Sequence, residues 1–149
     1  MIKTPDVLCI DKRDRQLYDD IARESIFKDH DRKEQFLVAM ATGFGAAAKR
    51  PLEGIESSGF FRTSYLQPQD RALINAVAVA ESQSVDVLLD PEAVFRTAEE
   101  YAHGGIQILH GEIMNTQYGS FDKRFEKVLS EAYDAVMDKG DEENPAGRA

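Results

Sequence analysis

Glu99, His103 and His110 are the three residues whose types and spacing come closest to a metal-binding site. Glu99 and His103 lie four positions apart, and His110 follows two turns later, so a helix would place carboxylate and imidazole on one face. However, the HExxH pattern of zinc hydrolases is absent, and a solvated polar face explains the same residues more simply. A metal-dependent hydrolase is therefore one hypothesis and not the leading one.

Lys49, Arg50 and Arg62 form the basic group best placed to meet DNA phosphates, since they flank the loop after the predicted central helix. The net charge is −9. Residues 51–149 carry 18 acidic and 8 basic side chains, whereas residues 1–50 carry 9 acidic and 10 basic ones. A phosphate backbone could therefore approach only the N-terminal third. Surface solubility also explains so small a cluster, and a DNA-binding regulator or sensor is the alternative hypothesis.

Other familiar catalytic motifs are absent from the sequence. Gly43 and Gly45, followed by Lys49, differ from the GxxxxGK[ST] phosphate loop and follow a predicted helix rather than a strand. Cys9 is the only cysteine, which excludes disulfide bonds within the chain and multi-cysteine zinc sites. It lies in an apolar run, where a small buried hydrophobic side chain is expected. We predict no catalytic residues and no cofactor.

Apolar residues at helical spacing predict the elements that position these side chains. The predicted helices span residues 12–24, 33–43, 68–82, 91–114 and 121–138. The second is apolar over most of its circumference, and we expect Gly43 and Gly45 to end it with a left-handed turn. Gly104 and Gly105 lie inside the fourth, where they mark either a kink or a close helix contact. Gly140 is expected to cap the last helix.

Two short segments, residues 7–10 and 60–66, have the composition of strands and would form a small ribbon if they pair. Residues 85–89 fit a strand or a helical turn. The fold class is therefore mainly α: a compact bundle of about five helices with a two-stranded β ribbon. We expect one domain over residues 1–138 and a disordered acidic tail over residues 139–149.

No apolar run reaches the roughly 18–20 residues that cross a bilayer. The N-terminal apolar patch is too short for a signal peptide. The sequence therefore predicts a cytoplasmic protein with no membrane partner.

Three segments together resemble a known family. They are KEQFLVAMATGF at residues 33–44, followed by RPL at residues 50–52, then DRALINAVAVA at residues 70–80 and AEEYAHGGI at residues 98–106. This pattern resembles Dnd system-associated protein 4, a family of small proteins that accompany DNA phosphorothioation loci. The resemblance covers roughly residues 7–115 and consists of packing positions, so it implies no catalytic residues.

The resemblance implies a setting in defence against foreign DNA, beside sulfur-modification or restriction proteins. The leading hypothesis is a non-catalytic accessory protein that binds other Dnd modification or restriction proteins. Its motivation is the missing catalytic motif, the acidic surface, and apolar helices that would leave a groove or a homodimer face.

Overall fold

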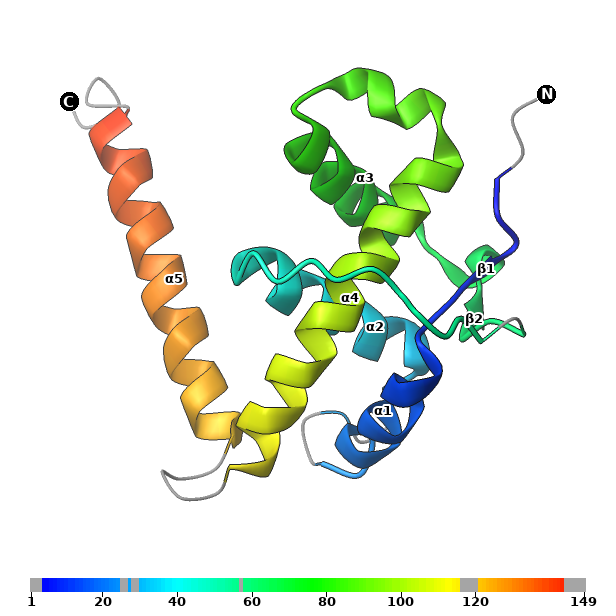
Figure 1. Ribbon diagram of the computed structural model, residues 1–149. Helices are drawn as coiled ribbons and strands as arrows, with labels where there is room; N and C mark the ends of the chain where they lie inside the picture. Colours follow the sequence, from blue (N-terminus) through cyan, green and yellow to red (C-terminus); the bar gives the residue numbers. More distant parts are fainter. Residues whose placement is uncertain (1–3, 25–26, 28–29, 57, 116–120, 144–149) are drawn as a thin grey trace. The chain divides into compact units, whose positions relative to one another are not determined.

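The computed structural model describes residues 4–24, 27, 30–56, 58–115 and 121–143 (Figure 1). The described part contains five α-helices and one two-stranded antiparallel sheet, which confirms the predicted mainly α fold. The chain divides into two compact units, Met1–Glu112 and Ile113–Ala149. The first unit holds the β ribbon, three helices and most of the fourth.

The β ribbon joins two segments that are far apart in the sequence. Strands β1 (Val7–Leu8) and β2 (Phe61–Arg62) pair antiparallel, with Leu8 opposite Phe61. The predicted pairing is therefore confirmed, but the second strand is shorter than residues 60–66. A 3₁₀ turn, η2 (Thr63–Tyr65), takes over directly after β2.

The predicted first helix is two elements, η1 (Lys12–Asp14) and α1 (Arg15–Ile21). Asp11 caps η1, because its carboxylate accepts a hydrogen bond from the backbone N–H of Arg13. This cap also buries Asp11 against the loop that follows α2, where it meets the backbone of Glu53 and Gly54.

Helix α2 (Arg32–Gly45) crosses α4 (Pro91–Met114) at very close range (Figure 1). A Cβ added to Gly105 would lie 1.8 Å from the carbonyl oxygen of Ala39, and one added to Gly43 would lie 2.0 Å from that of Tyr101. The glycines therefore mark a close helix contact. The predicted left-handed turn at Gly43 and Gly45 is wrong, because both glycines lie within α2 and that conformation falls at Ala47, with φ of 52°.

Helix α3 (Pro68–Ser82) has the predicted bounds, and a capping box between Gln67 and Asp70 explains its start. The ambiguous segment after it is a 3₁₀ helix, η3 (Val85–Leu89). The described helices include none that is long and apolar enough to cross a membrane.

Helix α5 (Phe121–Glu143) belongs to the second unit. It continues through Gly140, so the predicted end at residue 138 with a glycine cap is wrong. A glycine inside a helix costs about 1 kcal/mol, which the neighbouring helix-forming residues can offset. The remainder of the predicted tail, residues 144–149, lies outside the described residues.

Candidate functional site

A histidine and two aspartates are buried where the N-terminal segment meets α4. His103 is only 4% exposed, and its Nδ1 lies 2.5 Å from Oδ2 of Asp14. Its other ring nitrogen, Nε2, lies 3.8 Å from Oδ2 of Asp11. Both aspartates are also buried. Asp11 is the N-cap of η1, and Asp14 is the last residue of η1. This network joins residues about 90 positions apart in the chain.

The two aspartates have opposite environments. A hydrogen bond from the Arg13 side chain, supported by backbone N–H donors, holds the pKa of Asp11 well below its usual range. Burial instead raises the pKa of Asp14, and the hydrogen bond with His103 opposes that rise. All three side chains are buried, so the network can hold the N-terminal segment against α4. A general acid or base must be within hydrogen-bond distance of its substrate, and these buried groups are not open to one.

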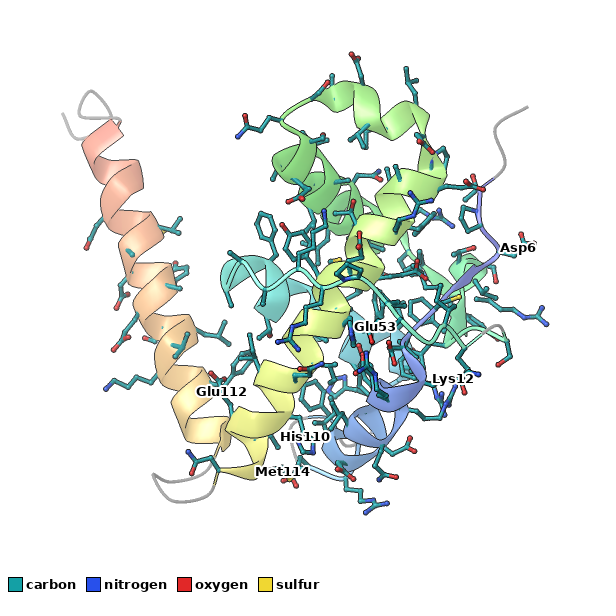
Figure 2. The ribbon with its side chains drawn as sticks, in the orientation of Figure 1. Asp6, Lys12, Glu53, His110, Glu112 and Met114 are labelled. Atoms are coloured by element: carbon teal, nitrogen blue, oxygen red, sulfur yellow. The ribbon has the colours of Figure 1, made fainter. Side chains whose placement is uncertain are left out.

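The three predicted metal ligands go to three different partners. His103 contacts Asp14, whereas Glu99 accepts a hydrogen bond of 2.5 Å from the backbone N–H of Cys9. His110 points from α4 toward α1, where its Nε2 lies 2.9 Å from Oδ2 of Asp20 (Figure 2). Across the described ranges, no three His, Cys, Asp or Glu side chains are grouped so as to hold a metal ion.

Burial changes the titration of Glu99 and Cys9. It raises the pKa of the Glu99 carboxyl to about 7, against the lowering effect of the Cys9 hydrogen bond. Burial and the nearby Glu99 charge raise the pKa of the Cys9 thiol to about 11. A thiol with so high a pKa is protonated at neutral pH and is a poor nucleophile.

The predicted DNA-contacting residues lie at opposite ends of α2. Lys49 forms a salt bridge of 2.7 Å with Glu81, and Arg50 Nη1 donates to Gln107 Oε1 at 2.7 Å, both beyond the C-terminus of α2. Arg62 lies beside the N-terminus of the same helix. Since 14 helical residues span about 21 Å, the structure does not bring the three together.

A cavity of about 420 Å³ opens between the N-terminus of α2 and the β2–η2 segment. Basic and aromatic side chains dominate its lining. The lining residues are Asp31, Arg32, Lys33, Ser58, Gly59, Phe60, Phe61, Arg62 and Tyr65. We call this the ribbon cavity. It lies entirely within the Met1–Glu112 unit.

Sequence reasoning identified one residue of the ribbon cavity and missed the others. Arg62 was predicted, but with Lys49 and Arg50 as its companions. Arg32 lies one residue before the predicted helix of residues 33–43, and in the structure it is the first residue of α2. The available signal was the run Phe60-Phe61-Arg62, followed by Tyr65, which interleaves aromatic and basic side chains.

An apolar stripe along α5 is not covered within its own unit, Ile113–Ala149. Val128, Leu129 and Val136 are 59%, 54% and 67% exposed, and Tyr133 and Met137 are exposed beside them. These fractions are unusual for aliphatic side chains on one helix face, which are buried when the helix packs within its own domain. A contiguous apolar face of this kind is typical of an interaction surface.

The fold and these sites define a small helical protein with a basic cavity, an exposed apolar helix and buried ionisable groups that contact one another. The chain belongs to the family of DNA sulphur modification system-associated protein 4, whose model matches residues 14–144. The match covers most of the 149 residues and includes α5, which the resemblance over residues 7–115 left out. No curated protein and no solved structure matches the chain.

Proposed function

We propose that this protein is a non-catalytic accessory protein of a DNA phosphorothioation system and acts by binding a larger protein of that system. The family association with DNA sulphur modification supplies the setting. The observation that carries the binding role is the exposed apolar stripe of α5. The setting in defence against foreign DNA is part of the same proposal.

The chemistry of α5 indicates which surface would receive it. Between residues 125 and 138 the helix carries four carboxylates and one lysine, Lys127. Val128, Leu129 and Val136 fall on one arc of the helix at spacings of one, seven and eight residues. An apolar groove edged by lysine or arginine side chains on the partner complements both features. This is the helix-in-groove mode of recognition.

The buried ionisable groups support a non-catalytic role. Asp11, Asp14 and His103 are enclosed and hydrogen bonded, and Glu99 contacts the backbone of Cys9. Their partners are all residues of this chain, so their arrangement explains the fold of the N-terminal segment on α4 without any substrate.

The test is co-purification of the full-length chain with the proteins of its own modification locus. Leu129→Asp places a carboxylate on the apolar stripe, and Ser130→Asp adds the same charge one position further around the same helix. We expect the first variant to lose the complex and the second to keep it. Equal retention by both variants, or no complex with the wild-type chain, contradicts the proposal.

Light scattering of the protein alone separates a partner protein from a second copy. We expect a monomer, because the proposal assigns the stripe to a different protein and not to a second copy of the chain. A dimer that Leu129→Asp dissociates would assign the stripe to self-association and would refute the proposed use of α5.

A further inference from the structure

The ribbon cavity gathers positive charge on a chain whose net charge is −9. Two exposed arginines contribute it from different elements, Arg32 from the first turn of α2 and Arg62 from β2. The fold brings these residues together across 30 positions of sequence. In a predominantly acidic protein, such a convergence attracts an anion to one place.

The other charged side chains of the cavity already have partners. Lys33 forms a salt bridge of 2.9 Å with Asp70, and both side chains are largely buried. Asp31 caps α2 by accepting a hydrogen bond from the backbone N–H of Glu34. Arg62, in contrast, makes no salt bridge with any side chain that the structure describes. Its guanidinium is therefore available to a ligand.

Two of the aromatic side chains of the cavity, Phe60 and Phe61, are buried and packed on other rings, whereas the third, Tyr65, is exposed. Phe60 packs on the buried ring of Tyr18 with centroids 4.6 Å apart, and Phe61 packs on Phe36 at 5.5 Å. The Arg32 guanidinium lies 4.8 Å from the centre of the Phe60 ring, which fixes its position at the cavity. Tyr65 is 63% exposed and presents its ring to whatever enters.

We propose that the ribbon cavity binds a nucleotide, with its phosphate on Arg32 and Arg62 and its base stacked on Tyr65. Guanidinium groups match phosphate oxygens in geometry and charge, and aromatic side chains stack on any base. A volume of about 420 Å³ lies within the usual range of small-ligand sites. This inference goes beyond the accessory role and does not depend on α5.

The nucleotide would come either free or as part of an unpaired strand. Bases in a duplex are stacked on one another, so a duplex offers a base to Tyr65 only if that base is flipped out of the stack. A second cavity of about 480 Å³ shares Arg62 in its lining, together with the exposed Ser64 and with Asp6. Its volume gives room for a neighbouring nucleotide whose phosphate would also meet Arg62, and on this ground we favour a strand.

Fluorescence anisotropy of the full-length protein with a labelled oligothymidylate, over a salt series, tests the proposal. Thymidine monophosphate, followed by calorimetry, and a duplex of the same length are the comparison ligands. We expect Arg32→Gln and Arg62→Gln each to weaken strand binding roughly tenfold and to lower the salt dependence by about 0.7 per contact. Tyr65→Ala should also weaken it roughly tenfold.

Arg23→Gln is the matched control, because it removes one exposed arginine outside the cavity. All these substitutions fall on exposed side chains, and circular dichroism checks that each variant keeps its helices. If thymidine monophosphate binds as tightly as the oligothymidylate, the ligand of the cavity is a free nucleotide, and the proposal of a nucleotide site is supported.

Three results would overturn it. One is the absence of binding to either nucleotide ligand at low salt. Another is an equal loss in Arg23→Gln and Arg62→Gln. The last is binding of a polyglutamate peptide as tightly as the oligothymidylate, with the same loss in the cavity variants. That result would show that the cavity binds carboxylates. None of these results depends on the complex formed by α5, so the two proposals fail separately.

Discussion

Tyr18 places a hydroxyl group in the core without a hydrogen-bond partner among the described residues. Its ring is 1% exposed and supports Phe60. Burial raises the pKa of this phenol well above its usual value. An unsatisfied buried hydroxyl costs about 1–3 kcal/mol, so Tyr18 contributes through its ring and not through its oxygen.

Tyr18→Phe is therefore expected to keep or increase stability, by up to about 1 kcal/mol, because it removes the unpaired hydroxyl and keeps the ring. Tyr101→Phe is the matched control. The hydroxyl of Tyr101 donates to Glu81, so its loss should cost about 1 kcal/mol. Urea unfolding of both variants measures the difference. A destabilised Tyr18→Phe variant would show that the hydroxyl has a partner, such as a buried water.

Glu99 gives the protein a pH-dependent stability of predictable sign. Its pKa rises from an ordinary 4.5 to about 7 in the folded state, so the folded chain binds the proton more tightly than the unfolded chain. The stabilisation is fully present below about pH 4.5 and is lost as the pH rises through about 7. The charged neighbours Arg96 and Glu100 oppose each other in this effect.

Glu99→Gln should remove this dependence while the amide oxygen still accepts the Cys9 N–H. We expect the variant to gain about 1–3 kcal/mol relative to the wild type between pH 5 and pH 8, since one pKa unit corresponds to about 1.4 kcal/mol. Denaturant unfolding at both pH values measures it, with the exposed Glu92→Gln on the same helix as control. A constant difference across this range would contradict the raised pKa.

At the scale of elements, the closest packing described is the crossing of α2 and α4, where the two backbones are in contact. Gly43 and Gly105 allow the two backbones to touch, because neither residue has a Cβ to hold them apart. Gly104 similarly receives the carbonyl oxygen of Ala48, from the segment after α2. The same crossing places the N-terminus of α2 beside β2, which forms the ribbon cavity.

Gly105→Ala should destabilise the protein by about 2–4 kcal/mol, although alanine is the better helix former. Its new Cβ would lie 1.8 Å from a backbone oxygen, which cannot move aside as a flexible side chain could. Gly111→Ala is the matched control in the same helix, since no described atom lies within 4 Å of its Cβ position. That variant should gain up to about 1 kcal/mol. Thermal melts with opposite signs would confirm the crossing, and equal signs would contradict it.

At the scale of the whole molecule, the two proposed surfaces lie in different units of the chain. The ribbon cavity belongs to Met1–Glu112, whereas the apolar stripe of α5 belongs to Ile113–Ala149. The strongly acidic composition of residues 51–149 discourages broad contact with a duplex but is compatible with one local phosphate site.

The two surfaces should therefore be separable by single substitutions. Leu129→Asp is expected to abolish the protein complex and leave oligothymidylate affinity within twofold, and Arg62→Gln to do the reverse. Pull-down and anisotropy on the same protein samples measure both activities. Loss of both activities in either variant would indicate one shared surface or a global loss of folding, which circular dichroism distinguishes.

Local patterns determined the elements of this protein. Apolar spacing of three and four residues gave all five helices, because a helix must bury one continuous stripe. Pro91 after Asp90 fixed the start of α4, since a proline fits only the first turn. The family was also recognisable from packing positions along α2, α3 and α4, which the family match confirms.

Which residues lie together at each site depends on the tertiary structure and could not be predicted from local sequence patterns. The sequence grouped Arg62 with Lys49 and Arg50 by proximity along the chain, but the strand pairing of Val7 with Arg62 placed it beside Arg32 instead. Glu99, His103 and His110 share helical spacing, yet each meets a different partner on the N-terminal segment. Helical spacing specifies which side chains share a face, whereas their bonding partners depend on which distant segment covers that face.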